Sequence, residues 1–470
     1  MVKRILFVPI HDQSMIEMLP VAERIVKEGS FEPVFFLFNA ISNKNFSLLT
    51  ESKFRVIGPQ PQRPLIEVNH KGNSDTGESH FRKRPESSPG LVKTLVKLAL
   101  SSSVISFFWY LVKFWFMISR AKTVLQDENI AAVVVIGDRH VGWETAMIKA
   151  ANDMNIPSLI VPFAVSDPES DIEARLRLPE VKQYQVNSLI EKAAARRFPR
   201  WVRENGTGLM FFIPVGNALA ARVLGMMPDI PWTIGGGDAV KMAVPSPKAF
   251  RTFDAGGVLQ SKMVITGKPG DDMVYFAMQE LNPQEIRAEL GIQGSQRIIL
   301  CSVPQMAEHG LIPWDEHWQE TDFLFKTLSE IQGAVLVLSL HPQSNPHDYR
   351  QLAGKYGARL AERRIYELIP VCDVLVATYS SVVVQAIGCG KPAVVVDFYG
   401  LDYTYYDREP GVLVVKQREA LLPTIERLLY NDDEYNKMVE AQLKSSPDWL
   451  LLDGKCTSRV VDELTKLIIE

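Results

Sequence analysis

The feature that most constrains the fold of this chain is a repeated alternation between short apolar runs and helix-length amphipathic stretches. Strands that alternate with helices form a parallel sheet with helices on its faces. A chain of 470 residues also exceeds what one hydrophobic core normally supports, so we expect two such sheets. The expected strands are residues 5–10, 33–38, 131–136, 158–161, 241–244 and 263–266 in the N-terminal half, and 297–302, 335–340, 374–377 and 393–397 in the C-terminal half.

The join between the two expected domains lies near residues 267–296. The sequence Gly-Lys-Pro-Gly-Asp-Asp begins at Gly267, and Asn282 followed by Pro283 is typical of the start of a helix. The predicted parts are an N-terminal domain of residues 1–270 with insertions at 60–120 and 171–228, a C-terminal domain of residues 271–447, and a helix at 448–470 that crosses back onto the first domain.

Composition and charge disfavour several function classes. The chain carries 51 Lys and Arg against 55 Asp and Glu, and a formal net charge of -4 disfavours a nucleic-acid partner, which requires a basic face. The four cysteines are widely spaced without a Cys-x-x-Cys pair, so neither a zinc site nor a disulfide framework is predicted. The first apolar run is too short for a signal peptide. We therefore expect a cytoplasmic protein that holds no metal and no cofactor.

The most apolar segment is residues 91–120, and it allows three interpretations. Residues 98–112 carry no charge over fifteen positions, which is short of the roughly 20 residues that span a bilayer. A spanning helix would also separate strands that belong in one sheet. The other interpretations are a buried helix and an in-plane membrane helix. The in-plane interpretation rests on the aromatic residues Phe107, Phe108, Trp109, Tyr110, Trp115 and Phe116 and on the basic residues Arg82, Lys83, Arg84, Lys93, Lys97, Lys113, Arg120 and Lys122.

Two loops of the N-terminal half carry candidate catalytic side chains, because ligands of parallel sheets bind at the carboxyl ends of the strands. His11 and Asp12 follow the first strand, and the His11 imidazole can remove a proton from an acceptor hydroxyl near neutral pH. Alternatively, His11 only orients its loop. Asp138, Arg139 and Glu144 follow the third strand. The Asp138 carboxylate would orient His11 or bind substrate hydroxyls, or else cap the following helix.

The strongest motif of the chain is the strand-turn-helix unit of residues 372–397. Its strand leads into Thr378, Ser380 and Ser381 at a helix start, where hydroxyls and backbone amides can hold a diphosphate. The helix ends at a Gly-Lys-Pro turn, and the next strand ends at Asp397. A simple capping role for Ser380 would leave the rest of the unit unexplained.

Two further loops of the C-terminal half contribute weaker signals. His341 follows the second strand of this half, and two nearby prolines stiffen its loop. An imidazole at a strand end suits contact with a nucleotide phosphate, and turn chemistry alone gives no reason for it. Asp-Gly-Lys at Asp453 opens the last helix and is a weak signal by itself.

The order of these motifs resembles the GT-B superfamily: His-Pro, then Ser-Ser followed by Gly-Lys-Pro, then Asp-Gly-Lys before a terminal helix. Within it the chain resembles the non-hydrolysing UDP-N-acetylglucosamine 2-epimerases and the CDP-glycerol glycerophosphotransferase-like and capsule-type transferases. The resemblance covers nearly the whole chain apart from residues 60–120 and 171–228. It implies an α/β fold in which two Rossmann-like domains face each other across a cleft, with a helical insertion in the N-terminal domain.

The epimerase resemblance implies roles for four residues and also shows departures. It would make Asp138 an active-site acid and would place Ser380, Ser381 and Gln385 against the diphosphate and ribose. Gln385, however, stands where a ribose-binding Glu is expected.

Other departures lie in the N-terminal half. His11 and Asp12 occupy the place of an Arg, and residues 161–167 lack the His-Val-Glu-Ala-Gly stretch of that family. These departures count against 2-epimerisation. The Tyr- and Asp-rich stretch of residues 397–406 is instead similar to the glycerophosphotransferase-like families, so a transferase ranks above an epimerase.

The sequence therefore predicts a peripheral membrane glycosyltransferase that moves a sugar from a nucleotide-sugar donor, expected to be UDP-linked, to a lipid-linked or surface-polysaccharide acceptor. Its place would be the inner face of the cell membrane, since a second basic and apolar stretch begins at Arg196. A 2-epimerase-like enzyme, a non-catalytic GT-B-like binding subunit and a homodimer remain open. The predicted site residues are His11 and Asp138 for catalysis, His341, Thr378, Ser380, Ser381 and Gln385 for the nucleotide-sugar, and Asp12, Arg139, Glu144 and Asp397 for the acceptor or cleft.

Overall fold

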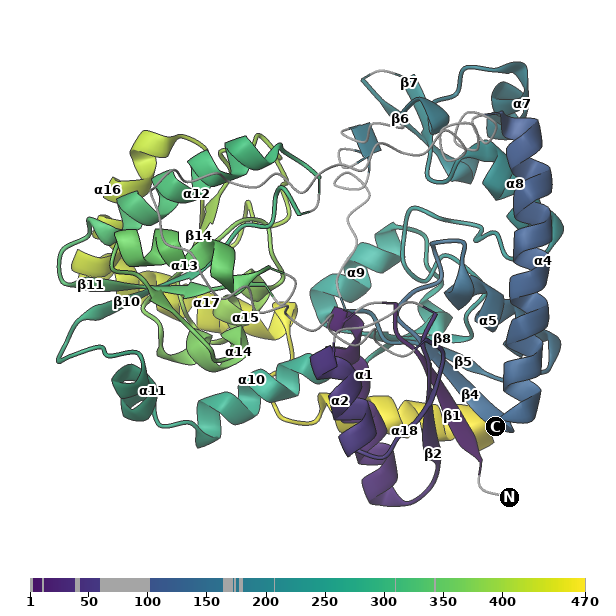
Figure 1. Cartoon of the computed structure of the whole chain (residues 1–470), viewed down its shortest axis with the longest axis horizontal. Helices are drawn as coiled ribbons and strands as arrows, with labels where there is room; N and C mark the ends of the chain where they lie inside the picture. The colour runs from purple at the N-terminus through teal and green to yellow at the C-terminus, as the bar shows by residue number, and fades with distance from the viewer. Residues whose placement is uncertain are drawn as a thin grey trace, which may run out of the picture.

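The computed structural model describes residues 3–10, 12–38, 43–59, 102–163, 172, 175–176, 181–206, 208–308, 310–341 and 344–469. These residues form two α/β domains, each built on a parallel sheet with helices on both faces (Figure 1). In both sheets the third, second, first, fourth and fifth strands lie side by side in that order, which is the doubly wound Rossmann arrangement. The predicted fold of two Rossmann-like domains is confirmed.

The N-terminal sheet has seven parallel strands in the order β3-β2-β1-β4-β5-β8-β9. Apolar side chains on both of its faces are buried, so near-continuous hydrophobic runs form its inner strands. Helices α4, α5 and α9 cover one face, and α1, α2 and α18 cover the other. The bounds are β1 (Arg4–Val8), α1 (Asp12–Glu28), β2 (Glu32–Phe36), α2 (Asn43–Glu51), β3 (Arg55–Ile57), α4 (Ser103–Asp127), β4 (Ile130–Val135), α5 (Trp143–Asp153), β5 (Ser158–Ile160), β8 (Lys241–Val244), α9 (Pro247–Ala255), β9 (Met263–Ile265) and α18 (Cys456–Ile469).

A smaller layer packs against another side of α4. Phe114 and Met117 of α4 form a separate apolar core with Trp201, Phe211 and residues of α7 and α8. Figure 1 shows these elements gathered at one end of the long α4 helix. Their bounds are α7 (Leu189–Arg197), β6 (Val202–Asn205), β7 (Gly208–Phe211) and α8 (Val215–Val223), with β6 and β7 antiparallel.

The C-terminal sheet has six parallel strands in the order β12-β11-β10-β13-β14-β15. Helices α12, α13, α16 and α17 cover one face, and α11, α14 and α15 cover the other. The bounds are α11 (Pro283–Glu289), β10 (Arg297–Ser302), α12 (Trp314–Ser329), β11 (Ala334–Ser339), α13 (Pro346–Lys355), β12 (Arg359–Leu360), α14 (Ile365–Leu368), β13 (Val374–Ala377), α15 (Val382–Gly388), β14 (Ala393–Val396), β15 (Val412–Val415), α16 (Leu421–Tyr430) and α17 (Asp432–Trp449).

All ten strands that the sequence predicts are present, with ends shifted by at most two residues. The sequence did not predict the outer strands β3, β12 and β15, which have three, two and four residues. Strands this short carry little periodic signal, and β3 begins with the exposed Arg55. The hairpin of β6 and β7 was also missed.

The two domains are joined by α10 (Pro269–Glu280) and by the returning helix α18. Both oxygens of the buried Asp272 carboxylate accept hydrogen bonds from the first amides of α18, on Cys456 (2.9 Å) and Thr457 (2.8 Å). An acidic side chain at a helix N-terminus is favourable because it satisfies free N–H groups. In Figure 1, α18 runs beside α1, so the C-terminus lies near the N-terminus.

The carboxyl ends of the two sheets meet at an aromatic contact. Lys248 lies at the start of α9, directly after β8, and its Nζ is 3.8 Å from the centre of the Trp449 ring and 5.3 Å from that of Tyr405. Tyr405 belongs to the loop that follows β14. Since Lys248 and Tyr405 each follow the carboxyl end of a strand, the loops at which ligands are expected in each domain are turned toward the other domain.

Helix α4 contains the most apolar part of the sequence. Within the described residues it is the one helix with the length and composition to cross a membrane, and 22% of its most apolar window is buried. Its inner side packs on the sheet, and β4 follows two residues after its end. β4 pairs with β1, which precedes α4, and the inner side of α4 packs on the sheet, so this arrangement counts against the spanning interpretation. One side of α4 is exposed.

Candidate functional site

The fold marks two places where a ligand is expected. The strand order reverses between β1 and β4 in the N-terminal sheet and between β10 and β13 in the C-terminal sheet. Doubly wound sheets bind ligands at such switch points, outside the carboxyl ends of the strands. In the C-terminal domain, the pairing of Cys301 with Val376 places the loops after β10 and β13 side by side.

The loop between β13 and α15 carries the predicted hydroxyl groups. Helix α15 begins after Ser381, which is its N-cap residue but makes no side-chain capping hydrogen bond. Within the described part of the chain, the hydroxyls of Thr378, Ser380 and Ser381 make no hydrogen bond, and Ser381 is exposed. The capping interpretation is therefore wrong. Because α15 has only seven residues, these hydroxyls rather than a long helix dipole are the groups available to a ligand.

Two tyrosines fix the backbone of this loop, which we call the hydroxyl loop (residues 378–381). The Tyr406 hydroxyl donates to the backbone oxygen of Ser380 at 2.9 Å, and Tyr406 is buried. The Tyr379 hydroxyl donates to Asp397 Oδ2 at 3.3 Å. The loop backbone is thus held from the side of β14, while its three hydroxyls are left for other partners.

Asp397 has a different place from the one predicted. Its side chain is 2% exposed, and its two oxygens accept hydrogen bonds from the amides of Leu401 and Asp402, both at 2.8 Å. The predicted acceptor or cleft role is therefore corrected: Asp397 shapes the loop after β14. The physical reason is that free amides of a tight loop bind the nearest carboxylate.

Gln385 and His341 lie beside the same switch point. Gln385 is one turn into α15, and its Oε1 is buried without a hydrogen-bond partner among the described residues. His341 is half-buried just after β11, and its backbone oxygen accepts a hydrogen bond from Ser344 at 2.9 Å. Their predicted roles in nucleotide binding stay predictions.

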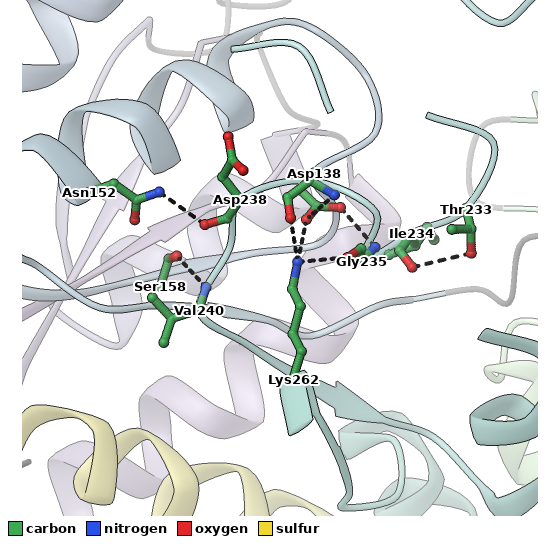
Figure 2. A network of polar contacts seen from close by, with 10 residues as sticks. Asp138, Asn152, Ser158, Thr233, Ile234, Gly235, Asp238, Val240 and Lys262 are labelled. Carbon is green, nitrogen blue, oxygen red and sulfur yellow. Dashed lines mark hydrogen bonds and ion pairs between the residues drawn. The ribbon is translucent and has the colours of Figure 1, made fainter. Parts of the chain in front are cut away.

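Asp138 is the centre of a buried network in the N-terminal domain (Figure 2). Its side chain is 1% exposed, and it accepts hydrogen bonds from the amides of Gly235 (2.8 Å) and Gly237 (3.0 Å). Lys262 Nζ lies 3.0 Å from Asp138 Oδ2 and also donates to the backbone oxygens of both glycines, at 2.7 and 2.8 Å. The carboxylate therefore holds a glycine loop and the ammonium group of Lys262.

The three glycines of this loop are required by its path. Gly235 has φ of +90°, and a Cβ there would lie 2.7 Å from Met242 Sδ. At Gly236 a Cβ would lie 2.1 Å from the backbone oxygen of Ile230. The loop passes so close to the rest of the domain that only glycine fits.

This geometry corrects the capping interpretation of Asp138. The helix that follows is capped at Gly142, so Asp138 is not an N-cap. A cavity of about 10 Å³ beside it is lined in part by Thr145, Ile148 and Lys149 of α5. In the structure Asp138 holds the glycine loop and Lys262, and its predicted catalytic role stays a prediction. An orienting contact with His11 is not tested, because His11 lies outside the described residues.

Glu144 is likewise buried and bound to the backbone. Its Oε1 accepts hydrogen bonds from the amides of Ile136 (3.0 Å) and Gly137 (3.1 Å), at the end of β4. These hydrogen bonds lower the pKa of the Glu144 carboxyl, but burial has the larger effect and raises the pKa to about 8. The predicted acceptor or cleft role is corrected for Glu144. Arg139 is half-buried, and its guanidinium lies 5.5 Å from the centre of the Phe212 ring. Nothing is described of the side chain of Asp12.

Sequence reasoning missed several polar residues. Lys262 is 124 residues away from Asp138, and no motif links the two. Glu308, Ser344 and Tyr349 form a second, partly buried network behind the loops after β10 and β11. No motif marks Glu308, because its partners come from other loops and helices.

One group of side chains has the spacing of metal ligands. Oxygen and sulfur atoms of Asp272, Asp453 and Cys456 lie within 4.8 Å of one another. Asp272 is already bound by two amides of α18, and Asp453 pairs with Arg459. These contacts account for the cluster as a helix start, so no metal site is inferred from it.

Comparison with known proteins places the similarity mainly in the C-terminal domain. Residues 241–466 match the family model described as CDP-Glycerol:Poly(glycerophosphate) glycerophosphotransferase. A curated relative, the teichoic acid poly(ribitol-phosphate) polymerase of Bacillus spizizenii, is 25% identical over 244 residues, which are 48% of this chain and 37% of that protein. The match thus spans little more than a third of the relative's length. Both names describe transfer or polymerisation of polyol phosphates, which supports a transferase-type enzyme.

Solved structures resemble the whole chain in fold. The S. aureus MnaA structure with UDP has a TM-score of 0.55 at 14% identity, covering 100% of this chain and 98% of that chain. The UDP-GlcNAc 2-epimerase of Neisseria meningitidis bound to UDP-GlcNAc has a TM-score of 0.53 at 14% identity, covering 98% of this chain and 100% of that chain. At such identities the likeness concerns the fold alone. The resemblance to both predicted groups is confirmed.

Proposed function

We propose that this chain is a transferase that takes its group from a nucleotide-diphosphate donor and builds a surface polymer at the membrane. The observation that carries this proposal is the hydroxyl loop. It lies at the switch point of the C-terminal sheet, and its three hydroxyls make no hydrogen bond within the described residues. Hydroxyls and loop amides of this kind suit the oxygens of a diphosphate. The loop also lies inside the segment that matches the glycerophosphotransferase family model.

The donor we propose is a CDP-linked polyol, which refines the nucleotide-sugar donor predicted from the sequence. The family model names CDP-glycerol, and the curated relative names poly(ribitol-phosphate). With such a donor the transferred group is a polyol phosphate, and the leaving group is CMP. An acceptor hydroxyl attacks the phosphorus, so a base near that hydroxyl is required.

His11, which lies outside the described residues, remains the proposed base, and in the sequence it comes three positions after Val8, the last residue of β1. We expect His11→Ala to lower kcat at least 100-fold while donor binding is unchanged. The control is His140→Ala, which removes an imidazole from the neighbouring loop after β4. Unchanged turnover of His11→Ala with its natural substrates would exclude the base assignment.

Substrate profiling tests the function as a whole. The purified chain is incubated with CDP-glycerol, CDP-ribitol, UDP-N-acetylglucosamine and other nucleotide sugars, with and without polyol-phosphate acceptor lipids, and products are identified by mass. Transfer from a CDP-polyol only when acceptor is present is expected. Sugar transfer would restore the nucleotide-sugar interpretation, and a C2 epimer formed without acceptor would make the chain an epimerase. Nucleotide binding without any product would indicate a binding subunit.

The exposed side of α4 is the proposed membrane-binding surface. It presents seven apolar side chains that are 50% to 68% exposed, and they repeat at helical spacing along one side: Val104, Ile105, Phe108, Trp109, Val112, Trp115 and Phe116. The amino end of this stripe adjoins α7, because Ser103 Oγ donates to Glu191 Oε1. There Leu189 is 85% exposed.

Charge beside the stripe favours an anionic bilayer as its partner. The exposed basic residues next to the apolar surface are Lys113, Arg120, Lys192, Arg196, Arg197 and Arg200. A helix that lies in the interface buries its aromatic side and leaves cations at the headgroups. The nucleotide donor then reaches the enzyme from the cytoplasm, and the lipid-linked acceptor from the inner face of the cell membrane.

Liposome flotation tests this surface. Vesicles with phosphatidylglycerol should carry the chain, and vesicles of phosphatidylcholine alone should carry less of it. The triple variant Phe108→Ser, Trp115→Ser, Phe116→Ser is expected to float at least 10-fold less. Leu259→Ser, which removes another side chain that is 70% exposed, is the control and should float like the parent chain. Equal flotation of the triple variant would exclude α4 as the anchor.

A further inference from the structure

The loops after β10 and β11 are tied together by one carboxylate. Glu308 follows β10 and Ser344 follows β11, and Ser344 Oγ donates to Glu308 Oε1 at 3.1 Å. Gln305 Nε2, on the same loop as Glu308, donates to Ser344 Oγ at 3.2 Å. Gln305 and Ser344 are each only 8% exposed. Two loops that are separate in sequence therefore share a buried polar contact at the carboxyl edge of the sheet.

Two helices anchor this contact from behind. The Tyr349 hydroxyl of α13 donates to Glu308 Oε1 at 3.0 Å, and His317 Nε2 of α12 lies 2.9 Å from that hydroxyl. Since the Tyr349 proton is used by Glu308, His317 Nε2 must be the donor to Tyr349. Both side chains are almost fully buried, and burial lowers the pKa of the His317 imidazole, which favours its neutral form. Glu308 is thus held by two buried side chains that belong to helices α12 and α13.

The contact also fixes the turn that carries His341. The Ser344 amide donates to the backbone oxygen of His341 at 2.9 Å, which links the two residues directly. Movement of Ser344 would therefore move His341. Because β10 pairs with β13 on its other side, the loop of Glu308 lies between His341 and the hydroxyl loop.

We propose that Glu308 is a positioning residue of the donor site: it joins the loop after β10 to the turn that carries His341, so that both are placed before the nucleotide binds. This inference rests on the proposed function, because it takes the β10 to β13 switch point as the place of the nucleotide. Nothing in the sequence motif of the donor site includes Glu308.

The chemistry of a carboxylate suits this role. Hydrogen bonds that a charged acceptor receives are stronger than neutral ones, and Glu308 Oε1 receives two of them. Without the carboxylate, the largely buried hydroxyls of Ser344 and Tyr349 lose their acceptor, which is costly for a buried donor. The turn of His341 would then sample several positions, and each binding event would have to order it again.

Calorimetric titration with CDP, on the full chain, tests the proposal. Glu308→Ala is expected to weaken CDP binding at least 10-fold. Glu308→Gln keeps an oxygen that can accept from Ser344 and Tyr349, so its affinity should stay within about 3-fold of the parent chain. His341→Ala together with Glu308→Ala should bind no more weakly than His341→Ala alone, because Glu308 acts through that turn.

Three outcomes would overturn the proposal. The first is unchanged CDP affinity of Glu308→Ala. The second is an equal loss of CDP affinity in Glu308→Gln, which would mean that the charge of Glu308 contacts the ligand directly. The third is a loss of CDP affinity in the double variant that equals the sum of the two single losses. Gln442→Ala is the stability control: it removes buried hydrogen bonds to Lys391 and Gly411, at the opposite edge of the sheet. It should lower the unfolding temperature without changing CDP affinity. If the parent chain binds no nucleotide, the proposed function itself fails, which is a distinct result.

Discussion

The loops after β4 and after β13 occupy equivalent places, since each follows the fourth strand of a doubly wound sheet. Their polar side chains have opposite fates. In the N-terminal domain the Asp138 carboxylate is buried and bound by two glycine amides and Lys262. In the C-terminal domain the hydroxyls of Thr378, Ser380 and Ser381 make no hydrogen bond within the described residues.

This difference teaches how to separate a structural polar residue from a binding one at the same point of a fold. A carboxylate whose oxygens are both satisfied by the protein stabilises the fold and has little capacity left for a substrate. The hydroxyls of the hydroxyl loop are available to a ligand, because two tyrosines fix the loop backbone and the hydroxyls are not needed for that. Substitutions in the two loops should therefore act on different quantities, stability in one and donor use in the other.

The largest expected effect is that of Asp138→Ala on stability. The change leaves the Lys262 ammonium group buried without its counter-charge and leaves two glycine amides without an acceptor. Breaking a buried pair in this way costs about 3–5 kcal/mol. Urea unfolding of the N-terminal domain, followed by circular dichroism, should show that loss in the free energy of unfolding.

Asp153→Ala is the matched control for this prediction. Asp153 also pairs with two lysines, Lys122 and Lys149, but at the surface of the same domain. Surface pairs contribute about 0–1 kcal/mol, so its variant should unfold nearly like the parent chain. If both variants lost equal stability, the structural assignment of Asp138 would be wrong.

The sequence identified the loop positions better than the direction of their side chains. The ten predicted strands, nine of them inner strands, have apolar runs typical of a buried parallel sheet, so the two domains and their carboxyl edges were predictable. The position of Asp138 after β4 was also predictable. Its burial was not, because the bonds come from Gly235 and Lys262, which are distant in sequence and carry no motif that points to β4.

The hydroxyl loop was predictable because all of its features are local. Strand, hydroxyls and helix start lie within residues 374–388, so one short stretch defines the geometry. Glu308 was not predictable for the opposite reason: its partners come from the turn after β11 and from α13. Sequence motifs identify sites made by one loop more readily than sites made by several.

A smaller effect, on activity rather than stability, is expected in the hydroxyl loop. The double variant Ser380→Ala, Ser381→Ala should lower kcat/KM for the donor at least 100-fold, because each hydrogen bond to a charged group contributes about 1.5–3 kcal/mol. Its free energy of unfolding should stay within about 0.5 kcal/mol, since neither hydroxyl caps α15. Steady-state kinetics and urea unfolding measure the two quantities.

The control for the double variant is Ser329→Ala, at the end of α12. Its hydroxyl bonds only a neighbouring backbone oxygen, on Lys326, and it lies away from the carboxyl edge of the sheet. Donor kinetics should not change in this variant. If the double serine variant kept the full kcat/KM, the hydroxyl loop would no longer be a candidate for diphosphate binding.

The smallest effect concerns Glu144, the second amide-bound carboxylate after β4, and it depends on pH. Burial raises the pKa of this carboxyl from 4.5 to about 8, so between these values the folded chain keeps a proton that the unfolded chain releases. The stability that the fold gains from holding this proton is complete below pH 4.5 and is lost as the pH rises toward 8. Glu144→Gln stays neutral and keeps an oxygen for the amides of Ile136 and Gly137. The stability advantage of Glu144→Gln over the parent chain should therefore grow by about 1 kcal/mol between pH 6 and pH 7 in urea unfolding.

The control is Glu280→Gln at an exposed position, whose stability difference from the parent chain should not change with pH. A constant difference for Glu144→Gln would mean that the Glu144 carboxyl is ionised in the folded chain.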